Sequence, residues 1–461
     1  MRHTALALAT ATGLALAACG GGDDAQQGGE PGSEPGKVKY ASMVTFGDGY
    51  SDVGSYAVGS VTVRGGGKYT INGDGTALDP VLTGKIWTEV IAAQLGLPAP
   101  CAAQTGLDAG FDITRPTVPV VNHAGCFNYA QGGARVTDPV GIGHKQIASS
   151  PFGALTVPVV AQVADHLART GNAFRGDEIV FVMAGTSDVL HWMAYARSIA
   201  ESKSSDARRS VFASTLDTLL AAGAPDPVAA RAAIASATFA ATVRGLSREA
   251  ILQAAVDAAV RAGNTAAPAG AATIFAQAVA AADRAFDEAA ASSVVSDTPA
   301  LVASATTAAA ELVALVRSQL VGKGAGRVVV VNLPDTSVTP GALAGSAEVR
   351  VLAGKMVAAF NEQLRTGLAA DGKVLVVDAY TASRDQAANP GQFGLSNATQ
   401  PACRLEPRNA DLHYISLGCS LRTLEWGDVY RYAWADMDYP TPLAHQLLAR
   451  NVAQAMAARG W

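Results

Sequence analysis

The sequence predicts an α/β protein with a doubly wound parallel sheet flanked by helices and an alanine-rich helical insertion. Two continuous apolar runs, Ile179–Met183 and Val328–Leu333, are typical of strands buried on both faces of a parallel sheet. A helix pattern over 346–368 and another apolar run, Val374–Val377, follow the second strand. This alternation of strand, helix and strand favours a parallel arrangement.

Length and composition narrow the class of protein. The 461 residues are enough for one large domain or two ordinary ones, with a sizeable core. Charged residues make up 16% of the chain, below the roughly 25% usual for soluble domains, because alanine and glycine are abundant. The net charge of −5 gives no reason to expect a nucleic-acid partner, since nucleic acids bind basic surfaces.

The N-terminus is typical of an exported lipoprotein. Arg2 precedes an apolar stretch, 5–15, which is too short to span a bilayer. Leu16-Ala17-Ala18-Cys19 looks like a bacterial lipobox, which makes 1–18 a signal peptide and its cysteine the lipidated first residue, with a mature net charge of −6. Gly20 after this cysteine favours the outer membrane, by similarity to sorted lipoproteins. An ordinary secretory signal cleaved nearby is the alternative.

Four further cysteines suggest two disulfides, which an exported protein can form. They are Cys101, Cys126, Cys403 and Cys419. Of the three possible connectivities, nearest-neighbour pairing closes the shortest loops and is the predicted one. A metal site is not expected, because neither pair has CxxC spacing and no histidine lies nearby at ligand spacing. Nothing in the sequence indicates a cofactor.

Glycine and proline mark the segments that connect these elements. Residues 19–37 are predicted to be a flexible tether that precedes a single domain, 38–461. Residues 54–84 are expected to form loops or a hairpin, and the segments 97–127 and 384–425, which carry the cysteine pairs, are expected to be loops.

The first strand, at about 38–46, is predicted to end in the turn Gly47-Asp48-Gly49. Ser51 or Asp52 is then expected to cap a helix. This arrangement places backbone N–H groups at the carboxyl edge of the sheet, where open α/β folds keep their binding sites. A further helix, 86–95, is expected to end at Gly96.

The long alanine-rich stretch between the two central strands predicts a helical insertion over about 200–298. Helical pieces are expected near 209–222, 227–243, 247–262, 272–291 and 300–321. Only the last of these is expected to pack on the sheet. The remainder is predicted to be a structural hairpin or lid, with a partner-binding surface as the alternative.

The block around the first turn resembles the opening motif of the GDSL (SGNH) hydrolase family, Phe-Gly-Asp-Ser-x-Ser-Asp-x-Gly. The matching residues are Phe46, Gly47, Asp48, Ser51, Asp52 and Gly54. The family's nucleophilic serine is replaced by Gly49. Later blocks follow in the family's order, so the resemblance implies an SGNH-hydrolase-like fold and ester-hydrolase ancestry.

The later blocks also depart from the family at working positions. In the turn 128–134 the resemblance assigns a backbone oxyanion donor to Gly133, and glycine suits a close approach to substrate. The family's oxyanion asparagine corresponds to Ser187. In the final block Asp436 matches the residue that orients the catalytic histidine, but Tyr439 holds the histidine position.

These substitutions predict a catalytically degenerate family member. Glycine has no nucleophile, and tyrosine, with an ordinary pKa near 10, is a poor base at neutral pH. The favoured hypothesis is an outer-membrane lipoprotein that binds an acyl, lipid or glycan ligand in the former active cleft. One alternative is a working carboxylic-ester hydrolase with a non-standard site, for which Ser51 and His445 are the candidate substitutes. The other is an interaction protein that acts through its helical insertion.

Overall fold

The computed structural model describes residues 38–108, 110, 117–147, 153–404 and 415–461. The predicted signal peptide 1–18, the predicted lipidation site Cys19 and the predicted tether to residue 37 lie outside the described residues. Lys39–Trp461 form one compact unit, in which all the elements below are found.

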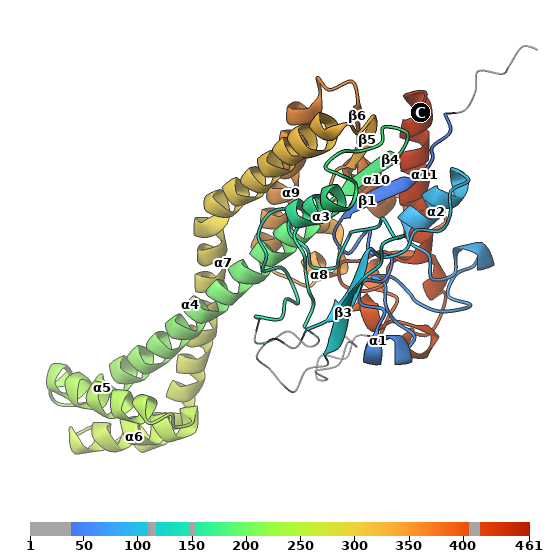
Figure 1. Ribbon diagram of the computed structural model, residues 1–461. Coiled ribbons are helices and arrows are strands. Elements are labelled where there is room, and N and C mark those ends of the chain that lie inside the picture. Colours follow the sequence, from blue (N-terminus) through green and yellow to red (C-terminus); the bar gives the residue numbers. More distant parts are fainter. Residues whose placement is uncertain (1–37, 109, 111–116, 148–152, 405–414) are drawn as a thin grey trace, which may run out of the picture. The chain divides into compact units, whose positions relative to one another are not determined.

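Four parallel strands form the central sheet. Their order is β1 (Met43–Gly47), β4 (Ile179–Met183), β5 (Arg327–Val331) and β6 (Val374–Val377). Every neighbouring pair is parallel and in continuous register. Helices lie on both faces (Figure 1), so the predicted α/β fold with a parallel sheet flanked by helices is confirmed.

The free side of β1 carries a short extra pairing. Thr45 forms a parallel bridge with Asn128, with backbone hydrogen bonds from Thr45 N to Phe127 O (3.0 Å) and from Tyr129 N to Thr45 O (2.8 Å). The chain thus passes from β1 to one side and returns to β4 on the other. In parallel sheets a reversal of this kind opens a crevice at the carboxyl ends of the strands.

Alternate strand residues face two different helix layers. Val44, Val180 and Val328 belong to a core shared with helices α3 (Val159–Arg169) and α9 (Ala347–Leu368). The next residue of each strand, Thr45, Phe181 and Val329, faces the helix layer on the opposite side of the sheet. There the Phe181 ring lies 5.5 Å from that of Trp87, in an edge-to-face contact.

Trp87 begins α2 (Trp87–Gln94), which packs against the final helix α11 (Pro442–Ala458). The predicted helix 86–95 is therefore confirmed. Two burial faces explain why the strands read as continuous apolar runs rather than as alternating patterns.

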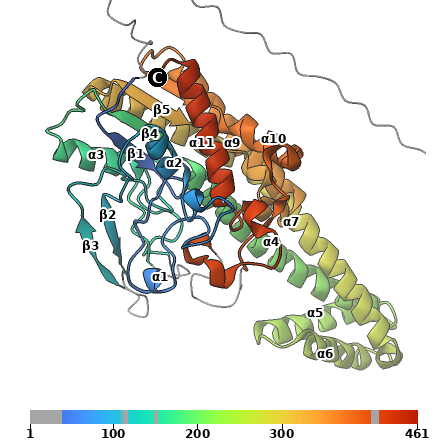
Figure 2. The same ribbon diagram turned by 90° about the vertical axis from the view of Figure 1, so that its right-hand side faces the viewer.

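The alanine-rich stretch folds into α4 (Thr186–Ala221), α5 (Pro227–Val243), α6 (Arg248–Arg261) and α7 (Ala267–Leu315). The separate pieces predicted near 209–222, 272–291 and 300–321 are parts of two long helices, and α7 continues through Pro299. Helices α4 and α7 pack along each other and carry α5 and α6 at their far ends (Figures 1 and 2).

These helices contribute to two separate cores. Val189 and Met193 of α4, and Leu301 and Leu312 of α7, join the core of the sheet. The expectation that only the last helix packs there is therefore wrong, because α4 begins at the sheet edge itself. A second core, formed by α5, α6 and the adjoining parts of α4 and α7, extends from Phe212 to Ala282. It lies inside the predicted insertion 200–298, whose status as an insertion stays a prediction.

One helical stretch of the described residues, Ala267–Lys323, is long and apolar enough to cross a membrane by length and composition alone. Of its most apolar window 44% is buried. Its packing against α4 and α9 accounts for that burial, so these residues serve as core here.

Several short elements were not expected from the sequence. The segment 97–127 contains an antiparallel pair, β2 (Gln104–Leu107) and β3 (Val118–Asn122), instead of loop alone. The segment 384–425 includes β7 (Asn397–Pro401), which pairs in parallel with β8 (Tyr432–Trp434). These strands are short and carry polar residues or proline, so they lack the apolar runs that mark the central sheet.

The remaining helices are short. In place of a hairpin, the segment 54–84 has one helical turn at each end. The helices and turns not yet given are α1 (Gly59–Val63), η1 (Pro80–Leu82), η2 (Val316–Leu320), η3 (Val321–Lys323), η4 (Thr336–Val338), α8 (Pro340–Leu343), α10 (Ala379–Ala388), η5 (Pro390–Phe393), η6 (Ser416–Gly418), η7 (Leu421–Thr423) and η8 (Val429–Arg431).

Both predicted disulfides are present, Cys101–Cys126 and Cys403–Cys419. The second packs in a small core with Ile71 and Ala435, next to the final sequence block. Cys403 N also donates a hydrogen bond to Ala435 O at 2.9 Å. This disulfide therefore holds the loop that precedes Asp436.

Candidate active site

The Gly47-Asp48-Gly49 turn lies at the carboxyl end of β1, as the sequence predicted. Asp48 N donates to Met183 O of β4 (3.3 Å), which ties the turn to the neighbouring strand. The side chain of Gln162 donates to Gly47 O and accepts from Gly47 N, both at 2.9 Å. No helix starts at Ser51 or Asp52, because both side chains bind other partners, and the next helix begins at Gly59.

Tyr439 occupies the space that a side chain at position 49 would need. A Cβ atom built on Gly49 would lie 2.7 Å from both Cε1 and Oη of Tyr439, closer than real Cβ contacts. Positions 49 and 439, which the resemblance assigns to nucleophile and base, therefore share one space, and the Tyr439 ring occupies it. Neither a serine hydroxyl nor a substrate carbonyl has room beside Gly49 while Tyr439 keeps this position.

Two other tyrosines complete an aromatic cluster over the turn. The ring centroid of Tyr439 lies 4.7 Å from that of Tyr69 and 5.4 Å from that of Tyr50. Tyr69 in turn covers Gly132, where a Cβ would come within 2.0 Å of its ring. Burial raises the pKa of all three hydroxyls above the ordinary value, so they remain protonated and are poor bases.

Asp436 binds backbone rather than a catalytic base. Its carboxylate accepts hydrogen bonds from the N–H groups of Ser416 (2.6 Å), Asp438 (2.9 Å) and Tyr439 (2.7 Å). Burial raises its pKa, and these donors oppose that rise. The residue that the resemblance assigns to orienting a histidine thus holds the turn that presents Tyr439.

Asp48 and Ser187 meet at the start of α4. The Asp48 carboxylate accepts from Tyr50 N (3.2 Å) and from Ser187 N (3.3 Å). Burial raises the pKa of Asp48 to about 7 despite these donors, with Asp188 adding to the rise. The Ser187 hydroxyl is fully buried and has no hydrogen-bond partner among the described residues. It does not line the cleft described below, so it is not placed to act as an oxyanion donor.

The second block is fastened to the first by Asp52. Its carboxylate accepts from Gly54 N, Ser55 N and Ser55 Oγ, and also from Gly132 N at 2.8 Å. Gly133 follows with a φ of +79°, a conformation that favours glycine, and it lines the cleft. Gly133 therefore lines the same cleft as Asp436 and Tyr439, and its role as an oxyanion donor stays a prediction.

The two candidate substitutes for the missing catalytic groups have structural roles. Ser51 is fully buried, and its Oγ accepts a hydrogen bond from Trp87 Nε1 at 3.2 Å. His445 is also fully buried, and burial lowers its pKa to about 3. The Tyr69 backbone interacts with its ring electrostatically, but without hydrogen-bonding geometry. Neither residue lines the cleft.

A cleft of about 540 Å³ opens beside Tyr439. One wall is α4, and the facing wall comes from the block around Asp436. Most of the lining is apolar or aromatic, with few charged groups. The lining residues are Tyr69, Gly133, Ile142, Gly143, Ile147, Leu190, His191, Met193, Ala194, Tyr195, Arg197, Ser198, Ile415, Asp436, Met437, Asp438 and Tyr439. This size and lining are typical of small-molecule sites.

A second hollow of about 620 Å³ lies between α4, α7 and α8. The two share Arg197, Ile415, Met437 and Asp438. Arg197 donates to Gly341 O at 3.0 Å. Burial and the nearby Asp436 raise the pKa of Asp438 to about 7. The residues shared by the two hollows include one basic and one acidic side chain, Arg197 and Asp438.

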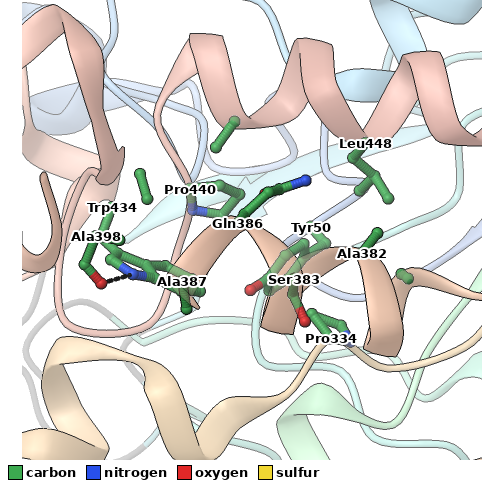
Figure 3. A pocket seen from close by; sticks show the side chains of 13 residues that line it. Tyr50, Pro334, Ala382, Ser383, Gln386, Ala387, Ala398, Trp434, Pro440 and Leu448 are labelled. Carbon is green, nitrogen blue, oxygen red and sulfur yellow. Dashed lines mark hydrogen bonds between the residues drawn. The ribbon is translucent and has the colours of Figure 1, made fainter. Parts of the chain in front are cut away.

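Figure 3 shows a separate, smaller pocket between α10 and α11. Its volume is about 50 Å³, and its walls are mainly alanine, with Trp434 fixed by a hydrogen bond from Nε1 to Ala398 O (3.0 Å). Tyr50 forms part of its wall. The pocket is too small for a substrate and belongs to the packing of α10 on α11.

Within the described ranges no three histidine, cysteine, aspartate or glutamate side chains gather closely enough to hold a metal ion.

The sequence singled out Gly49 and Tyr439 as substituted motif positions but did not predict that they touch. It gave no role to Tyr50 or Tyr69. Tyr69 comes from the glycine-rich segment 54–84, where nothing in the sequence marks a site residue. Of the two tyrosines that were missed, Tyr50 could have been suspected of lying at the site, because it stands inside the first motif.

The pH dependence of stability tests the burial of Asp48. Because its pKa is raised in the folded state, its contribution is fully present below about pH 4 and is lost as pH rises through about 7. Asp48→Asn cannot ionise, so its free energy of unfolding should gain about 2–3 kcal/mol relative to the native chain from about pH 5 to about pH 8. Urea denaturation measures this, with exposed Asp74→Asn as control; a pH-independent difference would contradict the assignment.

The contact between positions 49 and 439 predicts coupled mutations. Gly49→Ser should cost about 1–3 kcal/mol of unfolding free energy, because the new side chain meets the tyrosine ring. Tyr439→His should relieve this, giving a coupling energy of about 1 kcal/mol or more in a double-mutant cycle measured by urea denaturation. The same cycle with half-exposed Tyr195→Ala should be additive. Additivity in the first cycle would mean that the ring moves aside freely.

No protein-family model matches the chain, and no curated protein matches it. The likeness to the GDSL/SGNH family therefore rests on the motif residues themselves. Gly133, Asp436 and Tyr439 line one cleft at the edge of the sheet, and Tyr439 lies on Gly49.

Proposed function

We propose that this chain is a GDSL/SGNH-type lipoprotein that has lost its esterase chemistry and binds an acyl-bearing ligand in the cleft beside Tyr439. The observation that carries the proposal is the Tyr439 ring against Gly49, since position 49 has no nucleophilic side chain and the ring fills the space that one would need. The intact surroundings of the site favour a cleft that has been kept for binding.

The loss of chemistry follows from the groups that are present. Ester hydrolysis by this family's mechanism needs an activated hydroxyl, a base and oxyanion donors. Position 49 has no side chain, and burial raises the pKa of Tyr439 further above that of a useful base. The loss of a single oxyanion donor already costs roughly 10²–10³ in rate, and Ser187 does not reach the cleft.

The lining of the cleft favours an acyl chain over the other ligand classes. Ile142, Leu190, Met193 and Met437 supply apolar surface, and the second hollow next to α7 shares Met437 with the cleft. Apolar burial contributes about 0.8 kcal/mol per CH₂ group, so a long chain gains affinity along this path. A glycan would use the aromatic rings of the wall instead, and a head group of the ligand would meet Arg197.

The proposed location is the outer membrane, through a lipid on Cys19. The signal-like residues 1–18 and the lipobox-like sequence support this part of the proposal. The two disulfides agree with an oxidising compartment outside the cytoplasm.

The alternative of a working esterase that uses Ser51 or His445 is disfavoured by their positions. Both side chains are fully buried, and the serine hydroxyl is already bonded to Trp87. The other alternative, an interaction protein that acts through the helices, is compatible with the exposed surface of α5 described below.

Hydrolysis of short-chain nitrophenyl esters tests the loss of chemistry. Purified residues 20–461 should show no hydrolysis above background, whereas Gly49→Ser/Ser187→Asn/Tyr439→His should be at least about a hundredfold faster than the native chain. The double variant Gly49→Ser/Tyr439→His avoids enlarging buried Ser187 and covers a folding failure of the triple variant.

Native activity that disappears in Ser51→Ala or His445→Ala would show that the chain is a working enzyme. Native activity that survives both changes would place the reaction elsewhere and remove the assignment of the site. Circular dichroism of each variant separates lost chemistry from lost fold.

Displacement of a fluorescent long-chain fatty acid tests binding. The native chain should bind the probe, and Ala194→Trp should weaken binding about tenfold or more, because the indole fills the cleft. Ser210→Trp, on an exposed position of the same helix outside the cleft, should bind as the native chain does. If the native chain does not bind the fatty-acid probe, or if both variants lose binding equally, the acyl-ligand proposal is contradicted. Displacement of the probe by sugars but not by fatty acids would favour a glycan ligand.

A further inference from the structure

Helix α5 is apolar on every side but is covered on only one. It has a single charged residue, Arg231, among its 17 residues. Its inner face, which includes Ile234 and Thr238, belongs to the second core. A helix that is apolar all round is normally buried all round, so the uncovered side of α5 calls for a partner.

The uncovered side has a defined stripe, here called the α5 outer face. It consists of Val228, Ala232, Ala235, Phe239 and Val243, which recur at spacings of three and four residues and so share one side of the helix. Val228, Phe239 and Val243 are 83%, 70% and 69% exposed. A shallow groove of about 570 Å³ between this helix and the end of α4 lies alongside the stripe.

Charge distinguishes this part of the surface from the rest of the chain. Between Asp226, which caps the start of α5, and Glu249, in the first turn of α6, there are three arginines, Arg231, Arg244 and Arg248, and no acidic residue, although the whole chain has a net charge of −5. Arg231 and Arg244 are exposed, whereas Arg248 lies over the Phe212 ring at 5.6 Å. Exposed apolar groups flanked by arginine are complementary to an anionic lipid surface.

The neighbouring helix α6 provides an internal comparison. It also packs into the second core, but its exposed side carries Gln253 and Asp257, which hydrogen-bond to each other at 2.8 Å. Its most exposed large apolar side chain, Val260, is 40% exposed, and Val295 of α7 is a single position, so exposed apolar residues are concentrated on α5.

We propose that the α5 outer face docks on an anionic lipid bilayer. The helix lies along the surface and does not span it, because 17 residues measure about 25 Å and a bilayer core is about 30 Å thick. Its inner face stays packed on the second core, while Phe239 and Val243 enter the head-group region and Arg231 and Arg244 meet lipid phosphates. This surface is separate from the cleft, and the proposal does not depend on the ligand bound there.

Vesicle sedimentation tests the proposal on the full chain with Cys19→Ser, which prevents lipid attachment. Vesicles of phosphatidylcholine with about 30% phosphatidylglycerol should bind the protein about tenfold or more tightly than phosphatidylcholine alone. Phe239→Ser/Val243→Ser should weaken this binding about tenfold or more, and Arg244→Gln about fivefold. Val295→Ser, at a 61% exposed position of α7, is the matched control and should leave binding unchanged.

Three results would overturn the proposal. The first is equal sedimentation with the two kinds of vesicle. The second is equal loss of binding in Val295→Ser. The third is a concentration-dependent dimer in sedimentation velocity that disappears in Phe239→Ser/Val243→Ser, since it would assign the α5 outer face to a second copy of the chain. Circular dichroism confirms that each variant is folded, as expected for exposed positions.

Discussion

The contact of the Tyr439 ring with the Gly49 backbone determines what the rest of the site can be. Glycine leaves a space at the end of β1, and the ring of Tyr439 fills it. The two residues therefore complement each other in volume, as neighbours in a packed core do. The turn at the end of β1 is covered by three buried tyrosines, Tyr50, Tyr69 and Tyr439, so this part of the site is closed and aromatic.

The motif residues that remain are explained by the backbone groups they bind. Asp436 satisfies two N–H groups of its own turn and that of Ser416 in another segment, Asp52 joins the first block to Gly132, and Asp48 binds the start of α4. Loss of any of these carboxylates would leave buried donors unpaired, at about 1–3 kcal/mol for each group. Their presence is thus required by the fold whether or not the site reacts. This is why motif matches alone do not establish catalysis here.

The sequence predicted the elements that leave a regular pattern and missed those that depend on tertiary packing. Continuous apolar runs identified β4, β5 and β6, and short loop closure identified both disulfides. Helix α3, which was not predicted, and the polar strands β2 and β7 carry no comparable pattern. The break expected before Pro299 does not occur, because packing against α4 and α9 outweighs the local cost of proline. Contacts such as that of Tyr69 with Gly132 join distant segments, and single positions give no sign of them.

Helix α4 connects the two surfaces to which we assign roles. It begins where Asp48 binds Ser187 N, lines the cleft from Leu190 to Ser198, and continues to Ala221 next to α5. The 24 residues from Ser198 to Ala221 correspond to about 35 Å of continuous helix, which fixes the separation between the cleft and the α5 outer face. Because α7 packs along α4, bending this connection would break the shared core of both helices. The cleft and the α5 outer face are therefore joined by one continuous helix, and each can change in sequence without repacking the other.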